Sequence, residues 1–184
     1  MPVGRPVVVS LVAADVIHTF WAPNLHGKKD MIPGRRATIE FRADRAGTYR
    51  GQCAEFCGYE HALMAFLVVA DPPAEYDAWA ARQREAATSP SDEPEARGQQ
   101  LFMTAACARC HAIAGTPATG RLGPDLTHLA SRRTIAAGTL ANDRDALARW
   151  IADPRALKPA AMMPPSHLAP GDLQALVTYL GTLK

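Results

Sequence analysis

The chain has four cysteines, and all of them lie in two short segments whose residue types can bind redox-active groups. The first segment carries two thiols, an imidazole and a thioether, at Cys53, Cys57, His61 and Met64. The second segment is Cys107-Ala-Arg-Cys110-His111. Thiolates, imidazoles and thioethers are ligands of soft and borderline transition metals. Because no cysteine is left over, the sequence predicts two metal-containing sites and no disulfide.

The second segment has the spacing of an attachment site for c-type haem. Its two thiols can form thioether bonds with the two vinyl groups of one porphyrin, and the histidine that follows can bind the iron. A thioredoxin-like redox pair is the alternative use of a Cys-x-x-Cys sequence. Apolar residues at helical spacing before and after the segment favour the haem. We therefore expect Cys107 and Cys110 to carry a haem and His111 to bind its iron.

A loop downstream of this segment can supply the ligand on the other face of the iron. It runs from Lys158 to Pro165 and contains two adjacent methionines, Met162 and Met163. The order of helix, Cys-x-x-Cys-His, turn, methionine loop and final helix resembles the small class I cytochromes c of bacteria. In that family the axial methionine directly precedes a proline, so the resemblance assigns the ligand to Met163. Met162 is the second candidate and is otherwise a packing residue.

The first segment has one thiol too many for a mononuclear blue-copper centre, which uses one cysteine, two histidines and a methionine. Two thiolates four residues apart can instead bridge two copper ions, with His61 and Met64 on the same loop. A second imidazole must then come from elsewhere, and His18 is the best candidate because it ends an apolar strand. A structural zinc site with two cysteines and two histidines is the alternative, but it would leave Met64 without a role.

Nearly all of residues 2–79 closely resemble the binuclear copper domain of cytochrome c oxidase subunit II. The resemblance rests on the copper loop and on the stretches 2–7, 15–18, 27–30, 32–35 and 51–55. It implies that five side chains bind the copper pair, called CuA: His18, Cys53, Cys57, His61 and Met64. It also implies that Glu55 binds copper through its backbone carbonyl, while its carboxylate faces the catalytic subunit and helps to bind magnesium. Without the resemblance, Glu55 would be read as an exposed loop acid.

A cytochrome c domain after such a copper domain resembles the oxidases in which cytochrome c is fused to subunit II. The resemblance implies an electron-transfer module of a respiratory terminal oxidase. An external donor, either a cytochrome or a quinol-oxidising complex, would reduce the haem. The electron would pass to the copper pair and then to the oxygen-reducing centre of catalytic subunit I. No bond-making chemistry is expected on this chain, which would tune potentials through ligands and burial.

Two other functions stay open from the sequence. The chain could be a free-standing periplasmic electron carrier that shuttles between partners. It could also be a copper-handling protein with a haem sensor. The copper-handling function conflicts with Met64 and the second histidine, because these ligands close the site whereas copper delivery needs open coordination.

Members of the subunit II family begin with a transmembrane hairpin, and none is visible here. The longest apolar stretches, near 6–14 and 65–70, are too short to span a bilayer. No signal peptide is recognisable at the start of the sequence. Because haem is normally attached outside the cytoplasm, we expect a soluble fragment of a membrane subunit. Its location would be the periplasm or the outer face of a bacterial cytoplasmic membrane.

The pattern of apolar residues divides the chain into domains of different class. Residues 1–72 are predicted to form an all-β, cupredoxin-like Greek-key sandwich, with strands at Val7–Val12 and Ala37–Phe41. Residues 73–94 are predicted to form a helix over Pro73–Ala87 and a polar linker over Thr88–Pro94. Residues 95–184 are predicted to form an all-α class I cytochrome c domain that includes a helix over Asp145–Asp153.

Several residues around the two segments are candidates for supporting roles. Arg132 and Arg133 are candidate partners of the haem propionates, because guanidinium groups pair with carboxylates; otherwise they belong to a solvated loop. Trp150 can donate to a propionate or fill the core. Asp15 is placed to orient His18 or to cap a turn. The remaining histidines are expected at the surface: His26, His128 and His167.

The charge of the chain excludes one class of partner. The formal net charge is +2, and acidic and basic residues are mixed in both halves. No long run of one sign is present, so no nucleic-acid partner is expected.

Overall fold

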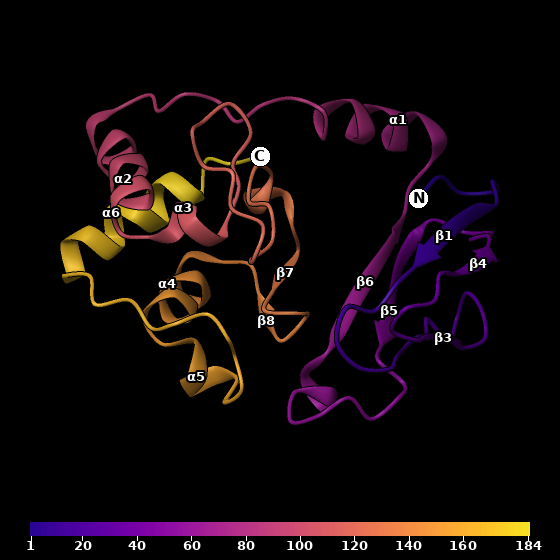
Figure 1. Cartoon of the computed structure of the whole chain (residues 1–184). Helices are drawn as coiled ribbons and strands as arrows, with labels where there is room; N and C mark the ends of the chain where they lie inside the picture. The colour runs from indigo at the N-terminus through magenta and orange to yellow at the C-terminus, as the bar shows by residue number, and fades with distance from the viewer. The chain divides into compact units, whose positions relative to one another are not determined.

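The computed structural model describes all 184 residues of the chain. The chain divides into two compact units. Unit 1 comprises Met1–Arg82 together with Ala137–Thr139, and unit 2 comprises Gln83–Ala136 and Leu140–Lys184. Figure 1 draws most of unit 1 in indigo and magenta, as strands followed by one helix, and most of unit 2 in the later colours, mainly as helices. None of the helices combines the length and the apolar character needed to cross a bilayer.

Unit 1 is built from three antiparallel strand pairs. The pairs are β1 (Val7–Leu11) with β4 (Ala37–Phe41), β2 (His18–Phe20) with β3 (Lys29–Met31), and β5 (Gly47–Gln52) with β6 (Ala65–Ala70). The first pair joins strands that are not consecutive in the chain. A short 3-10 turn, η1 (His61–Leu63), lies in the connection between β5 and β6.

Strand β4 shows why this segment forms a half-buried strand. Ile39 and Phe41 are buried, whereas Thr38 and Glu40 between them are exposed, which confirms the predicted alternation. Phe20 stacks on the ring of Phe41, with ring centroids 5.8 Å apart. It also stacks on Phe66 of β6 at 4.7 Å. Strand β2 is therefore held in the apolar core of unit 1.

The helix that follows the strands is shorter than the sequence predicts. Helix α1 spans Pro73–Arg82 and does not continue to Ala87. The backbone N–H of Ala87 donates to the carbonyl of Ala114 at 3.0 Å, so it is not available for a helical bond to the residue four positions earlier. The prediction of a helix over Pro73–Ala87 is therefore wrong at its C-terminal end.

Unit 2 contains the remaining helices. They are α2 (Glu93–Thr104), α3 (Cys107–Cys110), η2 (Leu129–Ser131), α4 (Arg144–Ala152), α5 (Pro154–Leu157) and α6 (Pro170–Leu180). Aspartates begin three of these helices, because Asp92 accepts from the N–H of Glu95, Asp143 from the N–H of Ala146, and Asp153 from the N–H groups of Arg155 and Ala156. Such caps stabilise a helix by about 1 kcal/mol. The predicted helix over Asp145–Asp153 is confirmed within one residue at each end by α4.

The core of unit 2 forms where α2 crosses α6. A Cβ atom at Gly98 of α2 would lie 2.2 Å from the carbonyl oxygen of Ala175 and 2.6 Å from Cβ of Tyr179, both on α6. The two backbones therefore approach as closely as only glycine permits. Next to this crossing, the rings of Phe102 and Tyr179 meet edge to face, with centroids 6.4 Å apart. Both side chains are almost completely buried.

Two sequence predictions for unit 2 are corrected by the structure. The unit is not purely helical, because β7 (Thr134–Ile135) pairs with β8 (Leu140–Ala141). The connection between them has positive φ at Ala136 and at the two residues that follow, a local conformation that the apolar pattern does not predict. His128 is not a surface residue, because it is only 8% exposed and its Nδ1 lies 2.8 Å from the carbonyl oxygen of Lys184.

Candidate metal centres

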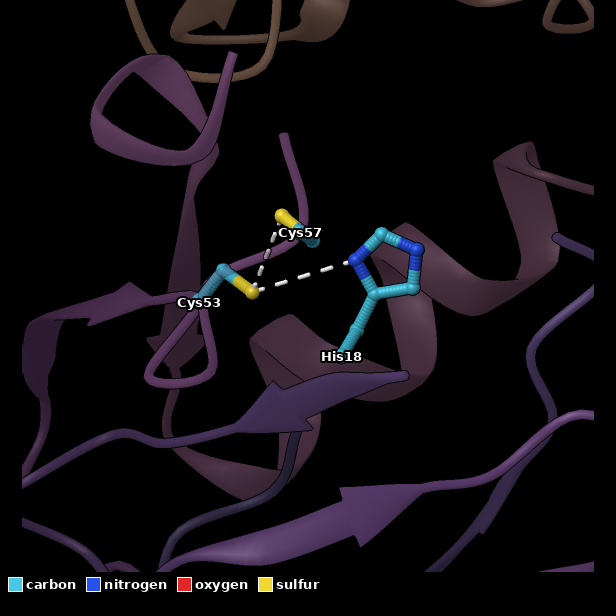
Figure 2. A group of neighbouring side chains, drawn as sticks. All are labelled: His18, Cys53 and Cys57. Carbon is cyan, nitrogen blue, oxygen red and sulfur yellow. Dashed lines mark hydrogen bonds between the residues drawn. The ribbon is translucent and has the colours of Figure 1, made fainter. Parts of the chain in front are cut away.

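The predicted copper ligands of unit 1 lie within one small cluster. Figure 2 shows the two sulfurs of Cys53 and Cys57 beside the ring of His18. The two sulfurs are 3.7 Å apart, and Nδ1 of His18 lies 3.8 Å from the sulfur of Cys53. On the other side of the pair, the sulfur of Cys57 lies 3.6 Å from Nδ1 of His61 and 3.9 Å from the sulfur of Met64. The structure thus brings together all five predicted side chains.

These distances fit ligands that share metal ions. With metal–sulfur bonds of about 2.3 Å and metal–nitrogen bonds of about 2.0 Å, tetrahedral angles place two sulfurs on one ion about 3.8 Å apart and a sulfur and a nitrogen about 3.5 Å apart. The observed separations are 3.7 Å between the sulfurs and 3.6 to 3.8 Å between sulfur and nitrogen. The two cysteines are free thiols and not a disulfide. A thioether is no ligand of structural zinc, so the presence of Met64 in the cluster favours copper over the zinc alternative.

Two strands and their ends hold the cluster in place. His18 begins β2 and does not end an apolar strand as predicted, while Cys53 directly follows β5 and Met64 directly precedes β6. The N–H of Cys53 donates to the carbonyl of Met64 at 2.9 Å, so the two ends of the ligand loop are closed on each other. The N–H of Ala54 donates to the carbonyl of Thr19 at 3.2 Å, which ties the loop to the strand that carries His18.

Asp15 fixes the orientation of the His18 ring. Its carboxylate lies 2.9 Å from Nε2 of His18, and the ring's Nδ1 faces Cys53. A carboxylate accepts from Nε2–H, so the neutral ring keeps its hydrogen on Nε2 and offers the lone pair of Nδ1 to a metal. Without a metal, the protonated ring donates from Nδ1 to the sulfur of Cys53. The hydrogen bond from His18 lowers the pKa of Asp15, which keeps the carboxylate ionised.

The two thiols of the cluster ionise unequally in the absence of metal. Burial opposes ionisation of Cys53, but hydrogen bonds from the backbone at Thr19 and Glu55 and from two imidazoles outweigh it and bring the pKa to about 6. Burial and the neighbouring Cys53 raise the pKa of Cys57 to about 11. Thiolates are the metal-binding form, and a second negative charge at 3.7 Å needs a compensating cation. The two thiolates therefore favour a site whose metal ions together carry more than one positive charge.

Glu55 presents two different groups at this site. Its backbone carbonyl oxygen lies 3.3 Å from the sulfur of Cys53, on the cluster, while the residue as a whole is exposed. The carbonyl is thus available as a copper ligand, and the carboxylate is available to a partner. The magnesium role of this carboxylate stays a prediction.

In unit 2, the ring of His111 is held for binding iron. Its Nδ1 lies 2.8 Å from the carbonyl oxygen of Pro124. A carbonyl only accepts, so Nδ1 carries the hydrogen and Nε2 keeps a free lone pair. A Cβ atom at Gly123 would come within 2.4 Å of the ring, and one at Gly120 within 2.5 Å of the backbone of Cys110. Both glycines let the downstream turn lie directly against the attachment segment.

The two cysteines of this segment are arranged for two separate bonds. They bound the one-turn helix α3 and are not joined to each other. Ala106 begins this helix with a left-handed φ of 68°, so the chain turns sharply after α2. Burial raises the pKa of Cys107, which packs against the apolar core of unit 2. The segment fits covalent attachment of a haem beside the His111 ring.

The two adjacent methionines lie in different environments. Met162 is 95% exposed, whereas Met163 packs against the buried core of unit 2. This favours Met163 as the residue that faces the haem pocket, although the expected packing role of Met162 is wrong. Lys158, at the start of the same loop, is 8% exposed, and its Nζ lies 3.5 Å from the carbonyl oxygen of Ala136.

The candidate propionate contacts lie in different environments. The Arg132 guanidinium donates to the backbone carbonyl of Asp125, and Trp150 packs against the buried core. Arg133 is exposed. The propionate roles of these three residues stay predictions.

Sequence reasoning did not identify two residues that organise the centres. The carbonyl of Pro124 orients His111, and the side-chain amide of Gln52 donates to the copper loop. A backbone carbonyl gives no residue-type signal. The amide of Gln52 could have been noticed only from its position next to Cys53.

Both units match known families. Residues 1–71 match the family model described as "Cytochrome C oxidase subunit II, periplasmic domain", and residues 95–184 match the model described as "Cytochrome c". Cytochrome c oxidase subunit 2 of Alkalihalophilus pseudofirmus is 40% identical over all of this chain and 53% of its own length. That of Bacillus sp. (strain PS3) is 33% identical, over all of this chain and 54% of its own length. The chain thus spans about half the length of these curated relatives.

A solved structure matches the first unit. The periplasmic domain of cytochrome oxidase subunit II of Bradyrhizobium japonicum is 38% identical over 43% of this chain and 57% of its own, with a TM-score of 0.42. The two family matches cover the part of the chain that carries the copper cluster and the part that carries the Cys107–His111 segment. Residues 1–71 therefore match the periplasmic-domain family of cytochrome c oxidase subunit II, and residues 95–184 match the cytochrome c family.

Proposed function

We propose that this chain is the electron-transfer module of a respiratory terminal oxidase. Its cytochrome c domain would accept electrons from an external donor, a cytochrome or a quinol-oxidising complex. Its copper domain would pass them to catalytic subunit I, on the periplasmic side of the membrane. Relatives named cytochrome c oxidase subunit 2, which align along the whole chain, support this proposal. We also infer that the strands of unit 1 follow the Greek-key order of a cupredoxin sandwich.

The observation that carries the proposal is the closed cluster of donors around the two thiols. Five side chains and the carbonyl of Glu55 approach within 3.3 to 3.9 Å of a neighbouring donor. A copper-handling protein needs coordination positions that exchange easily, and a site closed by His61 and Met64 disfavours this alternative. A preorganised set of ligands instead suits electron transfer, because the ligands move little when the charge changes.

A covalent haem and a copper pair would, when bound, supply one-electron chemistry. In unit 2, Cys107 and Cys110 would anchor the porphyrin, His111 would bind the iron through Nε2, and Met163 would provide the thioether on the other face. In unit 1, His18, Cys53, Cys57, His61 and Met64 would hold the copper pair, together with the Glu55 carbonyl. The exposed carboxylate of Glu55 would contribute to a magnesium site shared with the catalytic subunit.

Metal analysis tests the proposal directly. The ligand sets predict two coppers and one covalent haem for each chain. Elemental analysis of fully loaded protein should therefore give a copper-to-iron ratio near two. A ratio near one, or stoichiometric zinc in place of copper, would contradict the binuclear site.

A free-standing periplasmic carrier is the remaining alternative. It would use the same ligands but would need no catalytic subunit. The coding sequence upstream of Met1 separates the two functions. A transmembrane hairpin encoded there would support the subunit, and a signal sequence alone would support the carrier.

A further inference from the structure

The side chain of Gln52 spans the two ends of the copper-ligand loop. It lies next to Cys53, at the last position of β5. Its amide nitrogen donates to the carbonyl of His61 at 3.2 Å and to the carbonyl of Met64 at 3.0 Å. One amide group thus contacts the backbone of two predicted copper ligands. Both ligands lie at the C-terminal end of the loop, whereas Gln52 lies just before its N-terminal end.

The two backbone carbonyls determine the orientation of this amide, and Arg50 contacts its other end. The guanidinium of Arg50 lies 2.9 Å from the amide oxygen, and a guanidinium can only donate. The two backbone carbonyls can only accept, so they need the NH2 group. Both hydrogens of the nitrogen and one acceptor position of the oxygen are therefore used. A glutamate of the same shape would keep the Arg50 contact and lose both donations.

The backbone of Gln52 extends this link to the strand that carries His18. Its N–H donates to the carbonyl of Trp21 at 2.9 Å, just after β2. Gln52 therefore connects the three segments that supply copper ligands: the His18 strand, the Cys53 end of β5 and the His61–Met64 turn. The carbonyl of Met64 also accepts a hydrogen bond from the backbone N–H of Cys53, at 2.9 Å. The main-chain bond fixes one point of the turn, and the Gln52 amide adds the second, at His61.

We propose that Gln52 is a positioning residue of the copper centre. Its amide holds the His61–Met64 turn at the separation from Cys53 at which imidazole and thioether can share metal ions with both thiolates. Without the two donations, the His61 carbonyl loses its contact with Gln52, and the main-chain bond between Cys53 and Met64 remains to hold the turn to the end of β5. This inference rests on the proposed function, because it assumes that the cluster binds copper.

The expected effect is on copper affinity and on the electronic structure of the site. Removing a group that orients metal ligands typically weakens metal binding by about 10- to 100-fold. Displacement of His61 would also change how the unpaired electron is shared over two coppers. A general loss of fold stability would not alter the spectrum of the copper that remains bound.

The test compares the full chain with Gln52→Glu, each loaded with a copper salt. Competition with a chelator gives the copper affinity, and electron-spin resonance gives the hyperfine pattern. We expect Gln52→Glu to bind copper about 10- to 100-fold more weakly and to show an altered pattern. Arg50→Met is the matched control, because it removes the contact to the amide oxygen and leaves both donations to the loop. Its affinity and spectrum should match those of the wild type.

Wild-type affinity and spectrum in Gln52→Glu would overturn the proposal. If Gln52→Glu does not fold, the uncharged Gln52→Met decides in the same way, because it also lacks the donors. Unfolding of both variants would overturn the proposal as well, since Gln52 would then be a general folding determinant of unit 1. If the wild-type chain itself bound fewer than two coppers, the proposed function would fail and not the role of Gln52 alone.

Discussion

Met163 and Met162 differ at the residue scale in a way that spectroscopy can measure. The exposed Met162 has no buried surface to lose, whereas Met163 packs against the core of unit 2. Methionine ligation raises the reduction potential of a c-type haem. Met163→Ala should therefore abolish the weak absorption band of the iron–thioether bond and lower the potential.

Met162→Ala is the control for this experiment and should leave both the band and the potential unchanged. The reverse result would move the assignment by one residue. Persistence of the band in both variants would show that neither methionine binds the iron.

Cys57 offers a second measurement at the residue scale. Its sulfur lies beside Cys53 and also beside His61 and Met64, so it links Cys53 to the other two ligands of the loop. Cys57→Ser should reduce the copper content from two ions to one or none. The many-line spin-resonance pattern of an electron shared over two coppers should disappear. An unchanged pattern would show that Cys57 is not a ligand.

The predicted ligands could be found from sequence because each cofactor dictates residue types and their spacing. The thiol pairs and the histidines after them are such cases, and the structure brings the copper set together. Supporting contacts are less visible, because a carbonyl such as that of Pro124 belongs to every residue type. His128 is buried and not at the surface as the sequence predicts, because a single histidine in a short irregular segment carries no periodic signal of burial.

At the scale of elements, periodicity predicted the parts whose side chains alternate between core and solvent. Strand β4 and helix α4 are examples, with Ile39 and Leu147 on their buried faces. The predicted extension of α1 to Ala87 is wrong, because Ala87 makes a long-range hydrogen bond to Ala114, and a sequence pattern does not contain such a contact. The β7–β8 pair was missed for a related reason, because strands of two residues are too short to show alternation.

The crossing of α2 and α6 gives a prediction at this scale. A methyl group at Gly98 would overlap the backbone of α6 at Ala175, which is fixed by its own helix. Overpacking of this kind costs about 1–3 kcal/mol. Gly98→Ala should therefore lower the thermal midpoint of unit 2 by roughly 10 °C.

Gly171→Ala is a suitable control, because a Cβ atom there meets nothing within 4 Å. Circular dichroism of the haem-loaded chain measures both midpoints. Equal thermal midpoints in the two variants would mean that α2 and α6 can move apart without a loss of stability. That result would contradict the close crossing in the structure.

At the scale of the whole molecule, the length of chain between the units sets how often their centres can meet. Unit 1 ends at Arg82, and the N–H of Ala87 donates to the carbonyl of Ala114 within unit 2, so we expect the tether to lie between Arg82 and Ala87. A short tether keeps the partners at a high effective concentration. After photoreduction of the haem, copper reduction should therefore proceed at a rate that does not depend on protein concentration.

Insertions of Gly-Ser repeats test whether this tether controls the transfer. Ten residues added after Arg84 lengthen the free tether about threefold, and effective concentration falls with roughly the 3/2 power of length, so the rate should drop by about fivefold. The same insertion after Ser89 lies between two segments of unit 2, Ala87 and α2, and should leave the rate unchanged. If both insertions slow copper reduction equally, the tether is not confined to the residues between Arg82 and Ala87. A rate that rises in proportion to protein concentration would mean that electrons pass between molecules, and the relay within one chain would be wrong.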